Sequence, residues 1–95
     1  MTTSLQNELI VVSGASTGMG AATARALAEQ SYHVLAGVRR PRDADAIRAA
    51  NIEPVILDIT IPDHIDALVD RIDADPEKRS LRAVVNNAGI AINPP

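Results

Sequence analysis

The sequence predicts an α/β fold in which a doubly wound parallel sheet is covered by helices on both faces. Short apolar runs without alternation are typical of strands that are buried on both sides. Segments with helical periodicity or high helix propensity separate these runs, and the turns between them are short. The order is β-α-β-α-β-α-β, and no repeat or linker interrupts it. We therefore predict one domain over residues 1–95, with no room for a second.

The first half of the chain alternates strand and helix twice. Residues 8–13 are an apolar run ended by a glycine and predict the first strand. The alanine-rich residues 21–30 favour a helix, and residues 32–38 predict the second strand. An arginine-rich turn ends that strand, and Asp43 is placed to cap a short helix over residues 43–50.

The second half repeats the alternation. Residues 54–58 predict a third strand, and residues 81–85 predict a fourth whose apolar run fits burial on both faces of a whole sheet. With the strand order 3-2-1-4, we expect this fourth strand to lie at the edge of the sheet that residues 1–95 form. The helix between the third and fourth strands carries an apolar stripe at i, i+4, i+7, i+8 and i+11, opposite an acidic, solvated face. This stripe comprises Ile61, Ile65, Leu68, Val69 and Ile72. Pro62 suits the first turn of that helix, where its missing N–H costs nothing.

Composition excludes several classes of protein. Hydrophobic residues make up 46% and charged residues 22%, which is the balance of a globular chain. No cysteine is present, so disulfides and thiolate zinc sites are excluded. The net charge of −3 and a single aromatic residue argue against a nucleic-acid partner. The apolar runs are too short to span a membrane, and the first residues do not form a signal peptide, so we expect a cytoplasmic protein.

Histidines and carboxylates offer no metal or acid/base site in the sequence. His33 and His64 lack a second ligand at metal spacing and are expected to be structural or on the surface. The pairs Asp43/Asp45 and Asp73/Asp75 are expected to be solvated helix termini. We predict no metal and no catalytic residue.

A glycine-rich turn separates the first strand from the first helix. Gly14 can make the tight turn, Gly18 lets the backbone approach a pyrophosphate, and Gly20 lets the helix pack closely on the strand. The helix start offers free N–H groups and a positive dipole end, and Ser16 and Thr17 add hydroxyls. This pattern favours nucleotide binding over an ordinary tight turn of small residues. No lysine follows the last glycine, which excludes a phosphate-loop NTPase.

Three parts of the sequence together resemble one family. Residues 13–20 (S-G-A-S-T-G-M-G), Asp58, and residues 86–89 (N-N-A-G) resemble the short-chain dehydrogenase/reductase family, which has a Rossmann-like fold. The resemblance covers residues 9–90 in family order. Ser13 replaces the usual threonine and keeps its hydroxyl, and Met19 replaces isoleucine or leucine.

The resemblance implies a set of cofactor-binding residues. In the family, the positions of Asp58 and Ile59 lie beside the adenine, where the acid accepts a hydrogen bond from the amino group. A strand-ending, helix-capping role for Asp58 is the alternative. The turn at Asn86, Ala88 and Gly89 would pack beside the adenosine ribose and also fix the central sheet. The glycine turn would supply Gly14, Ser16, Thr17, Gly18, Met19 and Gly20 to the dinucleotide.

The end of the second strand indicates which dinucleotide is bound. An acidic residue there usually holds the free 2′-hydroxyl of NAD(H), but this position is Val38, which accepts no hydrogen bond. Arg39 follows and can pair with a 2′-phosphate. We therefore predict NADP(H) over NAD(H). A solvated basic loop is the alternative for the arginines. Asp43 or Asp45 could reach a 2′-hydroxyl, but both lie past Pro41 and are expected to start a helix.

The chemistry of the family lies outside this chain. The resemblance implies a catalytic Ser, Tyr and Lys, with Tyr-x-x-x-Lys on a helix, whereas this chain has only Tyr32 and Lys78, which cannot form that pair. We predict the N-terminal half of an NAD(P)-dependent oxidoreductase that interconverts alcohols and carbonyls, truncated before its catalytic half and inactive alone. A small alcohol or carbonyl substrate and homo-oligomers are expected only for full-length forms. The alternative is a non-catalytic dinucleotide-binding or interaction module.

Overall fold

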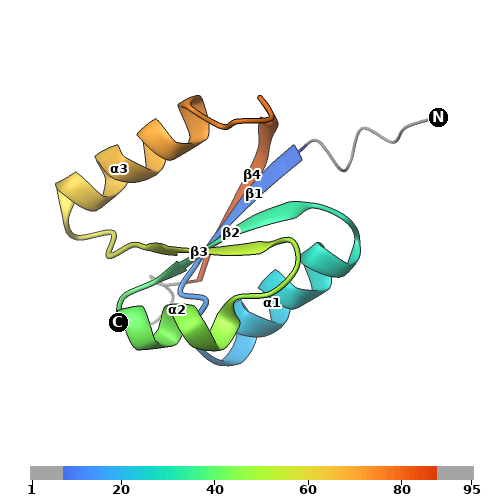
Figure 1. Cartoon of the computed structure of the whole chain (residues 1–95). Helices are drawn as coiled ribbons and strands as arrows, with labels where there is room; N and C mark the ends of the chain where they lie inside the picture. Colours follow the sequence, from blue (N-terminus) through green and yellow to red (C-terminus); the bar gives the residue numbers. More distant parts are fainter. Residues whose placement is uncertain (1–7, 88–95) are drawn as a thin grey trace, which may run out of the picture.

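A computed structural model describes residues 8–87 and confirms the predicted order of elements. Four parallel strands form one sheet in the order β3-β2-β1-β4, and helices connect them (Figure 1). The elements are β1 (Glu8–Ser13), α1 (Gly18–Glu29), β2 (His33–Val38), α2 (Pro41–Ile47), β3 (Ile52–Ile56), α3 (Pro62–Asp73) and β4 (Ser80–Asn86). The fold class is the doubly wound α/β sheet that the sequence predicts.

The two faces of the sheet are covered by different helices. Helices α1 and α2 lie on one side of the strands, and α3 lies on the other (Figure 1). Successive residues of β1 alternate between these layers, because Ile10 and Val12 pack toward α1 while Leu9 and Val11 pack toward α3. All four are at most 4% exposed. This double burial is the reason why the strand reads as a continuous apolar run.

Element boundaries differ from the prediction where turn residues join helices. Helix α1 begins at Gly18 rather than at residue 21, so its first turn consists of the glycine-rich segment itself. Helix α2 begins at Pro41, which places Asp43 in its first turn and makes Arg40 the capping position. Strand β3 begins two residues early and ends before Asp58.

Strand β4 is exposed along most of its length, with Val84 60% exposed, because it is the edge strand of the described sheet, as expected. Two other expectations about burial were wrong. No residue of α3 is fully buried, and Ile65 and Val69 of its apolar stripe are exposed. Asp75, expected in solvent, is 5% exposed between two arginines. Within residues 8–87, no helix is long and apolar enough to cross a membrane.

Candidate functional site

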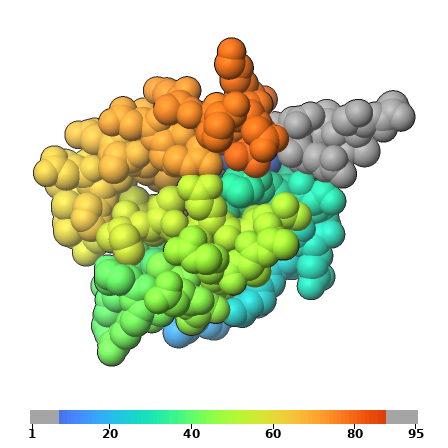
Figure 2. All heavy atoms as spheres, in the orientation of Figure 1, coloured from blue at the N-terminus to red at the C-terminus, as the bar shows by residue number. Residues whose placement is uncertain are grey.

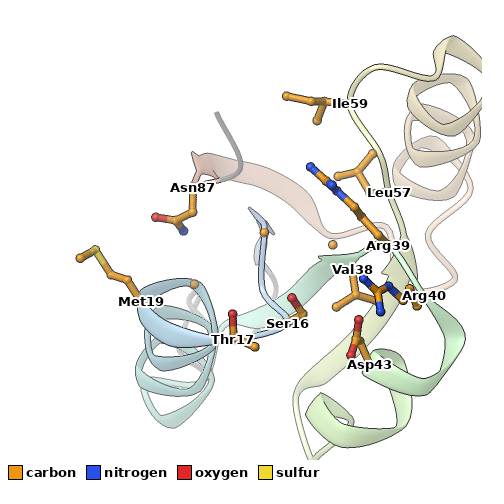
Figure 3. Close-up of a pocket in the computed structure, with 13 residues that line it drawn as sticks. Ser16, Thr17, Met19, Val38, Arg39, Arg40, Asp43, Leu57, Ile59 and Asn87 are labelled. Atoms are coloured by element: carbon orange, nitrogen blue, oxygen red, sulfur yellow. The ribbon is translucent and has the colours of Figure 1, made fainter. Parts of the chain in front are cut away.

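A cavity of about 520 Å³ opens at the carboxyl ends of β1 and β2. The glycine turn and the start of α1 form one wall, and the segments after β2 and β3 form the other (Figure 3). Ligands of open α/β sheets bind at this edge. The cavity is lined by Gly14, Ser16, Thr17, Met19, Gly20, Gly37, Val38, Arg39, Arg40, Asp43, Leu57, Ile59 and Asn87.

The glycine turn needs glycine for two separate reasons. Gly14 and Gly18 have φ angles of 62° and 58°, in the left-handed region where other residues are strained. Gly20 needs space instead, because a Cβ there would overlap the carbonyl oxygen of Gly14 and lie 2.8 Å from its carbonyl carbon. The amide of Ala15 donates to the carbonyl of Gly37 at 2.9 Å, which ties the turn to β2. The helix therefore starts in close contact with the strand end.

The first turn of α1 presents free backbone donors to this cavity. Thr17 precedes the helix in an extended conformation, and its side chain makes no capping hydrogen bond. The first turn also contains no acidic side chain. The first N–H groups of a helix have no intrahelical acceptor, and the helix dipole makes this end positive. Such an end is suited to an anion such as a pyrophosphate.

Asn86 and Asn87 at the end of β4 point to different partners. The Ser13 hydroxyl donates to Asn86 Oδ1 at 2.8 Å and accepts from the Asn87 backbone amide at 3.1 Å. Asn86 thus joins β4 to β1 and does not line the cavity. Asn87 does line it, and its Nδ2 is buried with no hydrogen-bond partner in the described part of the chain (Figure 3). A buried amide donor without an acceptor is costly, and a bound polar ligand would relieve that cost.

Two arginines and one carboxylate follow β2 at the edge of the cavity. Arg39 extends along the wall toward Leu57 and Ile59, while the guanidinium of Arg40 lies close to Asp43 (Figure 3). All five residues line the cavity. The basic charge predicted at the end of the second strand therefore reaches the site, together with one acidic group.

Asp58 lies between two lining residues but is not itself part of the lining. Its Oδ1 accepts from the Thr60 amide at 2.9 Å and from the Thr60 hydroxyl at 2.6 Å. These bonds, with the nearby positive charge of Arg39, hold the pKa of the Asp58 carboxyl below its usual range. The Asp58 backbone amide donates to His64 Nδ1 at 2.9 Å. The carboxylate thus organises the turn before α3 but does not cap the helix, whose capping position is Ile61 and which has no side-chain capping hydrogen bond.

The predicted site residues divide into three groups. The cavity brings together Gly14, Ser16, Thr17, Met19, Gly20, Arg39 and Ile59. Gly18, Asp58 and Asn86 are adjacent to lining residues without lining the cavity themselves. Ala88 and Gly89 lie outside the described residues.

Five residues line the cavity but are not among the predicted site residues: Gly37, Arg40, Asp43, Leu57 and Asn87. Their shared signal is position, because each lies at or just beyond the carboxyl end of a predicted parallel strand. No group of histidine and carboxylate side chains suited to a metal ion occurs within residues 8–87.

Comparison with known proteins gives the same assignment along the whole described chain. A family model described as short chain dehydrogenase matches residues 8–95. The chain is 30% identical over its full length to "Uncharacterized oxidoreductase YbbO" of Escherichia coli strain K12, and covers 35% of that protein. Over 85% of its length it is 46% identical to "Cis-4-hydroxycyclohexanecarboxylate dehydrogenase" of Sinomonas cyclohexanicum, and covers 34% of it.

Solved structures agree in fold. A short chain dehydrogenase from Bacillus anthracis superposes with a TM-score of 0.79 at 22% identity, over 92% of this chain and 37% of that one. The 2-keto-3-deoxy-D-gluconate dehydrogenase of Streptococcus agalactiae superposes with a TM-score of 0.76 at 26% identity, over 96% of this chain and 36% of that one. The chain spans about a third of the length of the curated relatives it matches. The family model and these relatives show that the chain belongs to the short chain dehydrogenase family, whose members are oxidoreductases that use NAD(P).

Proposed function

We propose that this chain binds NADP(H) in the cavity at the ends of β1 and β2, as the cofactor-binding part of an oxidoreductase. The observation that carries the proposal is the coincidence of an uncapped helix N-terminus and an unpartnered buried amide at one cavity. The absence of a Cβ at Gly20 keeps the start of α1 against β1. These features fit a ligand with a pyrophosphate and further polar groups.

The residues present suggest how the dinucleotide is held. The first turn of α1, with Ser16 and Thr17, would hold the pyrophosphate through N–H and hydroxyl donors. Leu57 and Ile59 would supply an apolar wall for the adenine, and Asn87 Nδ2 would donate to a polar atom of the ligand. When bound, the nicotinamide supplies hydride transfer between an alcohol and a carbonyl compound.

Preference for NADP(H) over NAD(H) follows from the charges beyond β2. Val38 offers no acceptor for a 2′-hydroxyl, whereas the guanidinium of Arg39 can pair with a 2′-phosphate. Arg40 adds a second positive charge, and Asp43 is the one lining carboxylate that opposes it. The positive groups outnumber the negative one at this end of the cavity.

Binding of adenine nucleotides to the whole chain tests this proposal. Calorimetric titration should give tighter binding for adenosine 2′,5′-bisphosphate than for 5′-AMP. Arg39→Asp should abolish this preference and leave 5′-AMP affinity nearly unchanged. Arg42→Asp is the matched control, because Arg42 is exposed nearby and does not line the cavity. Equal loss for both nucleotides in Arg39→Asp would show that Arg39 does not select the 2′-phosphate.

We also propose that hydride transfer requires groups other than the tyrosine and the lysine of this chain. Tyr32 packs against the core beneath α1, and Lys78 lies in the turn after α3, so neither lies at the cavity. The chain alone should show no turnover of NADPH with a panel of aldehydes and ketones. Turnover above that of an empty-vector preparation would contradict this.

Two further proposals concern where the protein acts and how longer relatives assemble. We propose a cytoplasmic location, where the reduced dinucleotide is available, and homo-oligomers for longer relatives. A chain that binds neither adenine nucleotide would instead favour an interaction module.

A further inference from the structure

The wall of the cavity beyond β3 is held by very few backbone hydrogen bonds. Strand β3 ends at Ile56, and the next amide, of Leu57, donates to the Val38 carbonyl at 2.7 Å. The amide after that belongs to Asp58 and donates to His64 Nδ1 at 2.9 Å. Leu57 and Ile59, on either side of Asp58, both line the cavity. The Asp58 carbonyl accepts from the Ile61 amide at 2.9 Å, so the histidine supplies one of the bonds that hold the backbone between two lining residues.

This bond constrains the protonation state of the histidine. A ring nitrogen accepts a hydrogen bond only when it carries no proton, so Nδ1 must be bare and the neutral ring must carry its proton on Nε2. Protonation of the ring puts a hydrogen on Nδ1 and places two donors face to face. The Asp58 amide then loses its acceptor, and the backbone between Leu57 and Ile59 loses one of its hydrogen bonds.

We propose that His64 is a positioning residue for nucleotide binding, which holds the Leu57–Ile59 wall only while its ring is neutral. The inference rests on the proposed function of the cavity and adds to it a dependence on acid. Its consequence is that affinity for the adenine-containing half of the cofactor falls when the ring takes up a proton.

Three charged groups lie near His64. The Asp58 carboxylate is on the turn whose amide donates to the ring, and its Oδ1 already accepts two bonds from Thr60. Arg39, at the end of β2, acts on the same carboxylate, and Asp63 precedes the histidine on α3.

The test uses ADP-ribose as the probe, because its pyrophosphate does not titrate in the range where histidines change charge. Calorimetric titration of the whole chain should show affinity about two- to tenfold weaker at about pH 5.5 than at about pH 8, the range set by one hydrogen bond. His64→Asn places an acceptor oxygen at the same distance along the side chain and cannot titrate. It should bind as tightly as the unchanged chain at the higher pH and lose the pH dependence. His64→Leu should bind weakly at both values.

His33→Gln is the matched control. His33 lies at the start of β2, where its Nε2 is 2.9 Å from Glu53 Oε1, and does not line the cavity. This variant should keep the pH dependence of the unchanged chain. A pH dependence that survives in His64→Asn would overturn the proposal, as would affinity that does not change with pH in the unchanged chain.

A measurement without ligand separates this inference from the proposed function. The NMR shift of the Asp58 amide should follow ring protonation in the unchanged chain and stay constant in His64→Asn. The Asp58 carboxyl does not interfere, since its pKa lies below the usual value of 3.8. If ADP-ribose binds to no variant at any pH, the proposed function fails. If the Asp58 amide shift does not follow protonation of the His64 ring, the positioning role of His64 fails, whether or not ADP-ribose binds.

Discussion

The two faces of the sheet are held by different kinds of interaction. On the α1/α2 face, side chains of three strands and two helices form one continuous apolar cluster. On the α3 face, the buried cluster consists of Leu9, Val11 and Leu35, and α3 covers them with partly buried side chains only. In the space-filling view, α3 (yellow to orange) forms a layer above the green atoms of α2 and β3 (Figure 2).

Ion pairs add to the apolar contacts where α3 meets the sheet. Arg71 of α3 donates to both carboxylate oxygens of Glu53 on β3, at 2.7 and 2.8 Å, and to Asp75 at 2.8 Å. Arg79, just before β4, donates to both oxygens of Asp75, at 2.8 and 2.9 Å. His33 of β2 reaches Glu53 from the other side. Two strands, one helix and the turn before β4 are thus connected through five charged or titratable groups.

The contrast between the two faces indicates that ion pairs can fix the position of a helix whose apolar side is only partly buried. Directional ion pairs need partners at defined distances, so they fix the position of α3 more narrowly than its half-exposed apolar stripe does. They are also more sensitive to pH and to loss of one partner. Substitutions on the two faces should therefore differ in how much they destabilise the fold.

Gly20→Ala should have the largest effect, because it attacks the tightest contact on the α1/α2 face. The new Cβ would overlap backbone atoms of Gly14, which cannot move without shifting β1 or α1. We expect a loss of about 4 kcal/mol or more in the free energy of unfolding, at the upper end for one substitution. Urea unfolding followed by circular dichroism measures it.

Gly18→Ala is the control for that substitution. Gly18 has a positive φ of 58°, but no atom lies within 4 Å of its would-be Cβ. Only backbone strain is added, so we expect a loss of about 1–2 kcal/mol. Equal losses for the two variants would show that the contact between Gly20 and Gly14 is not what requires glycine.

Asp75→Asn should have the next largest effect, on the α3 face. The variant keeps the shape of the side chain but removes the negative charge between Arg71 and Arg79, whose side chains are mostly buried. We expect a loss of about 2–3 kcal/mol in the free energy of unfolding, since two guanidinium groups lose their counter-charge. Asp73→Asn, at the exposed end of the same helix, should change stability little. A similar small change for Asp75→Asn would mean that packing alone holds α3.

Acid should weaken the α3 face before the α1/α2 face. Hydrogen bonds from Arg71, more than those from His33, lower the pKa of Glu53 from 4.5 to about 2. A carboxyl whose pKa is lower in the folded state than in the unfolded state stabilises the fold at pH values above its unfolded pKa. This stabilisation is lost as the pH falls toward and through its folded pKa. Stability should therefore decrease between about pH 4.5 and 2.

Glu53→Gln tests the source of this decrease. The variant should be less stable than the unchanged chain at neutral pH, and the difference should shrink as pH approaches 2. Thermal unfolding at several pH values gives this comparison. A constant difference between the two chains across that range would contradict a role for the Glu53 charge.

The part of the fold that follows from local chemistry was predictable. The apolar runs predicted the strands and their order along the chain. The glycine turn predicted the end of the sheet at which the cavity opens. Which of two neighbouring asparagines faces the cavity could not be predicted, because a shift of one residue along a strand reverses the direction of the side chain. Asn86 was the predicted site residue, but it bonds to Ser13, and Asn87 lines the cavity instead.

Long-range contacts explain the other errors. Asp75 and Arg79 lie four residues apart and resemble a solvated turn in the sequence, but the fold brings Arg71 and Glu53 to the same place. The burial of β4 also depends on what lies beside it, which its own residues do not encode. Its apolar run predicted a strand, and the expected strand order placed it beside β1 at the edge of the sheet, where it is exposed.

The smallest expected effect comes from a pair of valines that share one register position on the α3 face. Val11 of β1 and Val84 of β4 are direct partners in the ladder, so their side chains lie side by side on one face of the sheet. Val11 is 1% exposed and Val84 is 60% exposed, because α3 covers the first but not the second. Replacing either by threonine keeps the shape and adds a hydroxyl, so the two substitutions differ only in their surroundings.

Val11→Thr buries a hydroxyl among Leu9, Leu35 and the apolar side of α3, and should cost about 1–3 kcal/mol. Val84→Thr leaves the hydroxyl in water and should change the free energy of unfolding by less than about 0.5 kcal/mol. Its effect should lie in association instead, because an exposed apolar edge strand is a template for pairing between chains. Sedimentation of the Val84→Thr chain should show less self-association at unchanged thermal stability. A large loss of stability in Val84→Thr would mean that the Val84 side chain is covered in the protein. It would contradict the predicted difference between Val11 and Val84.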